Sequence, residues 1–355
     1  GYQRERVQEV LADVDVTFAV QEEQLGTGHA VKCAKEFIGE EGDVMILCGD
    51  TPLITGKTLA DAMAFHKKAG NAVTVLSAEL DDPTGYGRII RDANGTFVKS
   101  VEHKDATAAE RETKEVNAGM YFFRAKELFQ TLDLLRADNA QGEYYLPDVL
   151  TILKNDSEKI SVVVADDYTQ TLGINSRAQL AEADKVLRQR KNRELMDSGV
   201  TIIDPATTFI DAGVEVGMDT IIYPNTYLEG ATKIGENCAI GPNSRFTNMT
   251  VGDGVTAQFC YCHDAEIGDA VTLGPYVHIR PGTKISSRVK IGNFVEIKNS
   301  FVGEGSKLPH LQYIGDSDVG AGVNIGCGTV TCNYDGKNKH RTKIGDNAFI
   351  GCNTN

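Results

Sequence analysis

The 355-residue sequence predicts an α/β domain followed by a parallel β-helix, and three observations carry this prediction. Up to about residue 175, short apolar runs alternate with helical patterns, which is typical of an α/β layer with a mainly parallel sheet. Residues 176–198 contain no Gly or Pro, which favours one long helix. From residue 201 onward, apolar residues recur at every sixth position, the period of hexapeptide repeats in a β-helix.

The composition excludes some classes of partner. Lys and Arg number 36 against 50 Asp and Glu, so the net charge is −14. A chain this acidic is a poor electrostatic match for nucleic acid. No run of about 18 apolar residues occurs, so we expect no membrane insertion. The eight cysteines form no C-x-x-C pair, and we interpret them as reduced thiols of a cytoplasmic protein.

The first elements follow from apolar runs and stop signals. The run D-V-M-I-L-C at 43–48 predicts a buried parallel strand that ends in a loop. A helix is predicted over 57–69, stopped by a glycine, and a strand over 72–78. Residues 88–101 predict a hairpin with Asn94-Gly95 as its turn.

Four further elements complete the first part, and a long helix follows them. The sequence predicts a strand over 118–123, helices over about 125–136 and 146–154, and a strand over 160–165. The polar helix at 176–198 would be about 33 Å long. We interpret it as a mostly solvated arm that joins two domains.

The six-residue period is the strongest pattern in the sequence. The apolar residues that carry it are Ile210, Val216, Ile222, Leu228, Ile234, Ile240 and Phe246, then Ile267, Leu273, Ile279, Ile285, Ile291 and Ile297, then Val319, Ile325, Ile344 and Ile350. With three hexads per coil, the stretch from about residue 205 makes about eight coils. Glycine is concentrated here, with 21 of the 36 after residue 200, as coil corners require. Residues 332–343 break the rhythm and are predicted to loop out.

Several short motifs of the sequence are similar to those of a known family. They are Q-L-G-T-G-H-A (24–30), G-D-T-P-L-I (49–54), D-P-T-G-Y-G-R-I (82–89), V-E-H-K-D-A (101–106), E-V-N-A-G (115–119), N-A-Q-G-E-Y-Y-L-P-D (139–148), I-R-P-G-T (279–283), G-N-F-V-E-I-K (292–298), H-L-Q-Y-I-G-D (310–316) and N-I-G-C-G-T-V-T-C-N-Y-D-G-K-N-K (324–339). With them, the whole chain resembles the bacterial family of bifunctional N-acetylglucosamine-1-phosphate uridylyltransferases and glucosamine-1-phosphate acetyltransferases.

The resemblance implies a fold and a division into domains. The fold is a Rossmann-like α/β nucleotidyltransferase with a mainly parallel sheet, followed by a left-handed parallel β-helix of hexapeptide repeats. The domains are a uridylyltransferase domain at 1–175, a helical linker at 176–200 and an acetyltransferase domain at 201–355. Members of the family begin with a strand and a glycine-rich phosphate loop and continue for several more coils. We therefore expect this sequence to lack both ends.

The resemblance also implies two reactions that supply a precursor of peptidoglycan and lipopolysaccharide. Acetyl-CoA acetylates glucosamine-1-phosphate, and UTP then uridylylates N-acetylglucosamine-1-phosphate with release of pyrophosphate. The partners implied are these small molecules, Mg²⁺ at the uridylyl site, and two further copies of the chain in a homotrimer.

Asp50 is the candidate metal ligand of the first site. It follows a predicted strand, where open α/β sheets place their sites, and its carboxylate suits Mg²⁺. The resemblance implies Asn175 as the second ligand. The positions that it implies for UTP and UDP-N-acetylglucosamine are Gln21, Gly26, Thr27, Gly49, Asp50, Gly87, Glu102, Asn117 and Asn175.

His310 is the candidate general base of the second site. A histidine with a pKa near 6.5 suits removal of a proton from the attacking amine, and the resemblance places His310 at the family's base. The positions that it implies for glucosamine-1-phosphate are Arg280, Lys298, Tyr313, Asn324 and Lys339. Those that it implies for acetyl-CoA are Cys327, Asn333, Tyr334 and Cys352, where cysteine at 327 and 352 departs from the family's smaller or hydroxylated residues.

Two other functions remain open at this point. One is a sugar-1-phosphate nucleotidyltransferase, similar to ADP-glucose pyrophosphorylase, whose β-helix is regulatory. His310 and the N-Y-D-G-K-N-K stretch argue against it. The other is an inactive trimeric scaffold, against which the set of Asp50, Asn175, His310 and Lys298 argues.

Overall fold

The computed structural model describes residues 3–355, which form two compact units divided between Ala183 and Asp184. Residues 1–2, where the predicted first domain begins, lie outside the described residues. In the described range no helix has the length and apolar character needed to cross a membrane.

The first unit contains a six-stranded sheet in the order β4-β3-β5-β2-β6, with β1 also paired to β5. The strands are β1 (Asp43–Ile46), β2 (Val73–Glu79), β3 (Arg88–Arg91), β4 (Phe97–Val101), β5 (Glu115–Arg124) and β6 (Ile160–Val164). Of the described pairs, only β2–β6 is parallel, because β5 runs against each of its neighbours and β3–β4 is a hairpin. The α/β class is confirmed, but the sheet is mixed, and the prediction of a mainly parallel sheet is wrong.

Strand β1 differs most from its prediction. It is antiparallel to β5, and it alternates between a buried Val44 and an exposed Met45. Leu47, after the strand, is also exposed. An apolar run indicates a strand but not its direction or its number of neighbours, so burial on both faces could not follow from the residues alone.

The described part of the first unit also contains eight short elements of helix before α8. They are α1 (Arg4–Val10), α2 (Thr27–Lys32), α3 (Lys35–Ile38), α4 (Gly56–Ala69), α5 (Ala108–Arg111), α6 (Ala125–Leu132), α7 (Asp148–Asn155) and the 3₁₀ turn η1 (Tyr168–Thr171). Helix α4 confirms its prediction: Thr55 caps it by accepting from the Thr58 N–H, and Gly70 ends it in the left-handed region. Helices α6 and α7 pack on each other and add apolar side chains to the core.

The long helix α8 (Arg177–Asp197) is confirmed, and its last turns are not fully solvated. Leu195 is buried in the apolar core of the second unit. The amide of Asn192 donates to the carbonyls of Pro205 (3.1 Å) and Thr208 (3.2 Å). These contacts attach the end of α8 to the first coil.

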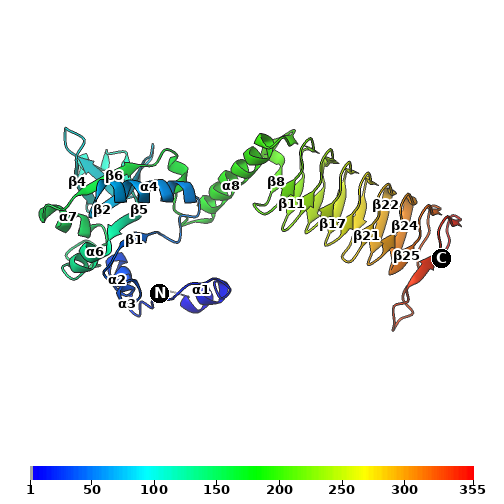
Figure 1. Cartoon of the computed structure of the whole chain (residues 1–355), viewed down its shortest axis with the longest axis horizontal. Helices are drawn as coiled ribbons and strands as arrows, with labels where there is room; N and C mark the ends of the chain where they lie inside the picture. The colour runs from blue at the N-terminus through cyan, green and yellow to red at the C-terminus, as the bar shows by residue number, and fades with distance from the viewer. Residues whose placement is uncertain (1–2) are drawn as a thin grey trace. The chain divides into compact units, whose positions relative to one another are not determined.

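The second unit is a parallel β-solenoid, as predicted (Figure 1). Its strands and one 3₁₀ turn are β7 (Thr201–Ile202), η2 (Pro205–Thr207), β8 (Phe209–Ile210), β9 (Glu215–Val216), β10 (Ile221–Ile222), β11 (Tyr227–Glu229), β12 (Lys233–Ile234), β13 (Ala239–Ile240), β14 (Arg245–Thr247), β15 (Thr250–Val251), β16 (Thr256–Ala257), β17 (Cys260–His263), β18 (Glu266–Ile267), β19 (Thr272–Leu273), β20 (Val277–Ile279), β21 (Lys284–Ile285), β22 (Lys290–Lys298), β23 (Phe301–Val302), β24 (Lys307–Gly315), β25 (Ser317–Val319), β26 (Asn324–Ile325), β27 (Thr342–Ile344) and β28 (Phe349–Ile350). One sheet stacks eight strands, β9 to β27, each one coil after the last, so it spans seven turns.

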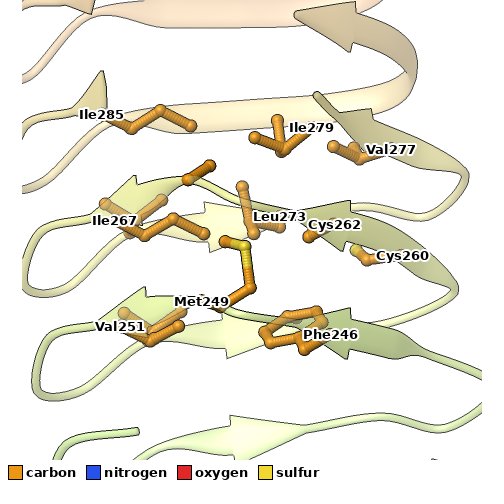
Figure 2. Close-up of a cluster of buried hydrophobic side chains, with 14 of the residues drawn as sticks. Phe246, Met249, Val251, Cys260, Cys262, Ile267, Leu273, Val277, Ile279 and Ile285 are labelled. Atoms are coloured by element: carbon orange, nitrogen blue, oxygen red, sulfur yellow. The ribbon is translucent and has the colours of Figure 1, made fainter. Parts of the chain in front are cut away.

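The hexad residues form the interior of the solenoid. Figure 2 shows side chains from successive coils, such as Val251, Ile267 and Ile285, stacked inside the ribbon. Most predicted hexad positions are buried, and Val216, Ile344 and Ile350 pack against the core at its periphery. The predicted loop at 332–343 is confirmed: the chain leaves the stack, and Tyr334 pairs with Lys339 in an antiparallel bridge (Figure 1).

Candidate active sites

Two adjoining cavities of about 530 and 450 Å³ lie beside the loop that follows β1. Both are lined by Cys48, Asp50, Glu102, Gly119 and Tyr121. The predicted positions for UTP and UDP-N-acetylglucosamine that line one or both are Thr27, Gly49, Asp50, Gly87, Glu102, Asn117 and Asn175. Folding therefore brings together seven of the nine positions, which are far apart in the sequence.

Asp50 and Asn175 flank the same glycine. A Cβ built on Gly173 would lie 3.5 Å from Asp50 Oδ2 and 3.7 Å from Asn175 Nδ2. The carbonyl of Asp50 also accepts from the Ile174 N–H at 2.9 Å, which fixes the two segments side by side. No cluster of three metal-ligating His, Cys, Asp or Glu side chains occurs among residues 3–355. A carboxylate with one amide oxygen fits Mg²⁺, which keeps several waters and takes further oxygens from substrate phosphates.

Gly87, Glu102 and Asn117 form the next part of this wall. The Glu102 carboxylate lies 3.3 Å from where a Cβ of Gly87 would be, and the Asn117 N–H donates to the Gly87 carbonyl at 2.9 Å. Burial, with Asp105 and Asp148 nearby, raises the pKa of Glu102. The Asn117 amide donates to Tyr121 Oη (2.9 Å) and Ser100 Oγ (3.1 Å) and accepts from the Gly119 N–H (2.9 Å). It therefore holds the wall in place as well as facing the cavity.

Gln21, Gly26 and Thr27 meet at the start of α2. The Gln21 amide donates to the Gly26 carbonyl at 3.1 Å, and Thr27 Oγ1 accepts from the Leu146 N–H at 3.0 Å. Gly26 has φ +107°, and a Cβ there would lie 2.6 Å from the carbonyl oxygen of Tyr144. Only glycine allows this approach of two backbones.

Replacing Gly26 by alanine is expected to displace this loop and to lower nucleotidyl transfer by roughly tenfold or more, because a small misplacement of binding groups is costly. Steady-state rates of pyrophosphate release measure it. Gly56→Ala is the control, since nothing lies within 4 Å of a Cβ at Gly56, at the start of α4. Equal rates for both variants would contradict the role assigned to the close approach.

The structure adds residues that were not among the predicted site positions. A third cavity, of about 260 Å³, is lined by Thr27 and Glu102 together with Lys104, Glu143 and Tyr145. Glu143 and Tyr145 belong to the motif N-A-Q-G-E-Y-Y-L-P-D. Its polar first half, which is typical of a loop, is the signal that could have pointed to them.

The second candidate site lies on the later coils of the solenoid. Arg280 donates to Glu296 Oε1 at 2.8 Å, one coil on. The Lys298 ammonium lies 4.0 Å from Asp316 Oδ2. The neighbouring ammonium of Lys339, together with burial, holds the pKa of Lys298 below its usual range. The structure thus brings together three of the five positions predicted for glucosamine-1-phosphate, as a cluster of cations.

His310 lies in β24, on an exposed part of the same coils. Its Nδ1 is 2.8 Å from Asn293 Oδ1, and the two residues are register partners in neighbouring strands. This contact favours the tautomer with hydrogen on Nδ1, which leaves Nε2 as the acceptor of a proton. In the described part of the chain, no hydrogen bond or ion pair joins His310 to the cations.

The remaining predicted residues lie on the same later coils or in the loop 332–343. Tyr313 follows His310 by three residues and folds over Gly315, and Asn324 begins β26. The amide of Asn333 donates to Asp316 Oδ2 at 2.5 Å, and the Tyr334 hydroxyl donates to the Gly336 carbonyl at 2.7 Å.

Cys327 and Cys352 occupy neighbouring coils. The Cys327 carbonyl accepts from the N–H of Asn353, the residue after Cys352, at 2.7 Å. Both thiols are free, one half-buried and one exposed.

Comparison with known proteins finds two family matches in separate parts of the chain. Residues 2–179 match the nucleotidyl transferase family, and residues 213–248 and 264–299 match the bacterial transferase hexapeptide family. The chain is 52% identical over 356 residues to bifunctional protein GlmU of Geobacillus sp. (strain WCH70), covering 100% of this chain and 77% of that protein. It is 54% identical over 355 residues to bifunctional protein GlmU of Caldanaerobacter subterraneus subsp. tengcongensis, with the same coverage.

A third relative, bifunctional protein GlmU of Carboxydothermus hydrogenoformans, is 52% identical over 355 residues, which are 100% of this chain and 79% of that protein. The matched region spans the whole chain and therefore both units. The chain is therefore a bifunctional transferase that joins a nucleotidyltransferase to a hexapeptide acyltransferase, and it belongs to the family of bifunctional GlmU proteins.

Proposed function

We propose that this transferase acetylates glucosamine-1-phosphate with acetyl-CoA and then transfers a uridylyl group from UTP to the N-acetylglucosamine-1-phosphate formed. Residues 1–175 form the uridylyltransferase domain, 176–200 the linker and 201–355 the acetyltransferase domain. The enzyme works in the cytoplasm and supplies UDP-N-acetylglucosamine for the cell wall.

In the uridylyl reaction, the sugar phosphate attacks the α-phosphorus of UTP and pyrophosphate leaves. Asp50 and Asn175 would hold Mg²⁺, which when bound neutralises charge on the phosphates. The backbone at Gly26 and Thr27 would contact the base, and Gln21 holds this backbone through the Gly26 carbonyl. Glu102, Gly87 and Asn117 form the wall against which the sugar lies, where amide and carboxyl groups can bind its hydroxyls.

In the acetyl reaction, the sugar's phosphate binds among Arg280, Lys298 and Lys339. A planar guanidinium suits phosphate, and three cations in an acidic chain attract a dianion. Nε2 of His310 accepts the proton of the amine as the amine attacks the thioester carbonyl. The imidazolium then returns this proton to the sulfur of coenzyme A as the C–S bond breaks, and coenzyme A leaves as the thiol. Asn293 keeps the ring in the tautomer that this step requires.

The active assembly that we propose is a homotrimer. One corner of the solenoid carries Phe259, Tyr276, Phe294 and Leu311 on successive coils. The last three are each more than half exposed, and all four have positive φ between 47° and 61°. Bulky side chains rarely adopt this conformation. The Tyr276 and Phe294 rings stack with centroids 5.2 Å apart.

A second copy is the occupant that best suits this apolar stripe. Leu311 directly follows His310 in β24, so a copy that covers the stripe would also border the acetyl site. The stripe would then be an interface, and acetyl-CoA would bind beside it.

The observation that carries the proposed function is the presence of two separate groups of side chains. The group beside Asp50 offers carboxyl and amide oxygens for a sugar and for Mg²⁺, and the group beside Lys298 offers cations for a sugar phosphate. The test is to assay both half-reactions on the purified protein and to measure its mass by light scattering. Acetyl transfer by a trimer is the expected result. A monomer with full acetyl transfer would contradict the assembly, and loss of acetyl transfer in intact trimers would contradict the reaction.

A further inference from the structure

Asp316 is a buried carboxylate for which the proposed mechanism has no role. It ends the motif H-L-Q-Y-I-G-D at a corner between β24 and β25, and it is only 5% exposed. Its Oδ1 accepts from the Asn299 amide at 2.6 Å and its Oδ2 from the Asn333 amide at 2.5 Å. Lys298 Nζ lies 4.0 Å from Oδ2.

These contacts join the two halves of the acetyl site. Lys298 is one of the cations proposed to bind the sugar's phosphate. Asn333 belongs to the loop 332–343, which leaves the solenoid and is proposed to contact acetyl-CoA. One carboxylate oxygen, Oδ2 of Asp316, therefore lies next to a group from each half.

The charges around Asp316 fit a functional role. Hydrogen bonding from Asn299, with further contributions from Asn333 and Lys298, holds its pKa below the usual value despite burial. The anion lies among Lys298, Lys339 and Arg280, where it reduces the repulsion between cations that must stay close together. A buried charge with two amide donors and a cation is costly to disturb.

We propose that Asp316 is a positioning residue for acetyl transfer, which fixes Lys298 and the loop at Asn333 relative to each other so that both substrates meet in the reactive geometry. The proposal rests on the proposed acetyl-transfer function. In this proposal Asp316 contacts neither the attacking amine nor the thioester. It orders the groups that bind the sugar phosphate and those that bind acetyl-CoA.

The chain offers a matched control at Asp264. Register pairs join Cys262, Ile279, Ile297 and Ile314 in one row across four coils, and Asp264 and Asp316 each follow a member of this row by two residues. Asp264 also has positive φ (51°), and it accepts from the Asn248 amide at 3.1 Å. It lacks the burial and the lysines. A role in shaping the corner would be common to both aspartates, whereas a role in acetyl transfer would belong to Asp316 alone.

The experiment compares Asp316→Asn with Asp264→Asn. The new asparagine has no charge and one acceptor oxygen fewer. Its own N–H therefore faces the donating amide of Asn299 or Asn333. We expect kcat/KM for acetyl transfer to fall roughly 10- to 100-fold, with raised KM for glucosamine-1-phosphate and for acetyl-CoA. Asp264→Asn keeps wild-type constants, and uridylyl transfer is unchanged in both variants.

A pH profile separates positioning from a purely structural role. The groups that face Lys298 are Lys339 and Arg280, which lower its pKa, and Asp316, which raises it. Without the Asp316 charge, Lys298 releases its proton at a lower pH. The KM for glucosamine-1-phosphate should therefore begin to rise at a lower pH in Asp316→Asn than in the wild type.

Three results would overturn the proposal. These are unchanged constants in Asp316→Asn, the same loss in Asp264→Asn, or a lowered melting temperature with an unchanged pH profile. If Asp316→Asn does not fold, Asn299→Ser keeps the charge but frees one carboxylate oxygen, and normal KM values in that variant would also overturn it.

Failure of the proposed function gives a different result. If the wild type transfers no acetyl group, that function falls. Calorimetry with acetyl-CoA and with glucosamine-1-phosphate then decides the role of Asp316, and equal affinities in wild type and Asp316→Asn would overturn it.

Discussion

Replacing His310 by alanine is expected to lower acetyl transfer by about 100- to 10,000-fold, the contribution of a well-placed general base. The ring lies exposed on β24 with Nδ1 held by Asn293, so Nε2 is free to take the proton of the attacking amine. Without it, the amine must lose its proton to water. Formation of free coenzyme A thiol from acetyl-CoA and glucosamine-1-phosphate measures the loss in the full-length protein.

Two controls make this result specific. Uridylyl transfer should be unchanged in the same variant, because His310 belongs to the solenoid and the nucleotide cavities belong to the first unit. His263→Ala should leave both reactions unchanged, since His263 pairs with its neighbour Asp264 at 3.3 Å on an earlier coil. Equal loss of both reactions in His310→Ala would mean that the substitution disturbs folding and that the role of base is misassigned.

Replacing Asp50 by asparagine is expected to lower uridylyl transfer by roughly 100- to 1,000-fold, as losing one well-placed electrostatic group in a site does. Asp50 lines both adjoining cavities and lies beside Asn175, and it supplies the only negative charge of this proposed ligand pair. The variant should also need more Mg²⁺ for half-maximal rate. Pyrophosphate release from UTP and N-acetylglucosamine-1-phosphate, titrated with Mg²⁺, measures both effects.

The matched control is Asp61→Asn on α4, an exposed aspartate whose carboxylate pairs with Lys57 at 2.6 Å. This variant should keep wild-type rates, because exposed ion pairs of this kind contribute little. Acetyl transfer should be normal in both variants. An unchanged Mg²⁺ requirement in Asp50→Asn would show that the metal is held elsewhere.

The repeat pattern made the second half of the fold predictable. Apolar residues at every sixth position are all buried in a solenoid, because each coil stacks on the one before, as Val251, Ile267 and Ile285 do inside the coils (Figure 2). The broken rhythm at 332–343 likewise predicted the loop. Local signals sufficed here because each coil contacts only its neighbours.

The first half was less predictable, and the reason is physical. The helix 57–69 and the hairpin turn at Asn94-Gly95 depend on nearby residues, and both are confirmed. Strand direction depends on which distant strands meet. The run 43–48 therefore revealed a strand but not that β1 lies antiparallel to β5 with one face exposed.

The candidate sites divide in the same way. The types of residue and their motifs, such as Asp50 after a strand and His310 in H-L-Q-Y-I-G-D, were evident from the sequence and its resemblance to a family. The sequence by itself determined the repeat, the strands of the first sheet, the helices of eight or more residues, and the chemistry that each motif can perform, because these depend on neighbours along the chain. Only the tertiary structure decided that the strand before Asp50 is antiparallel and that Asp316 contacts Asn299 and Asn333, because such contacts depend on segments that meet only when the chain has folded.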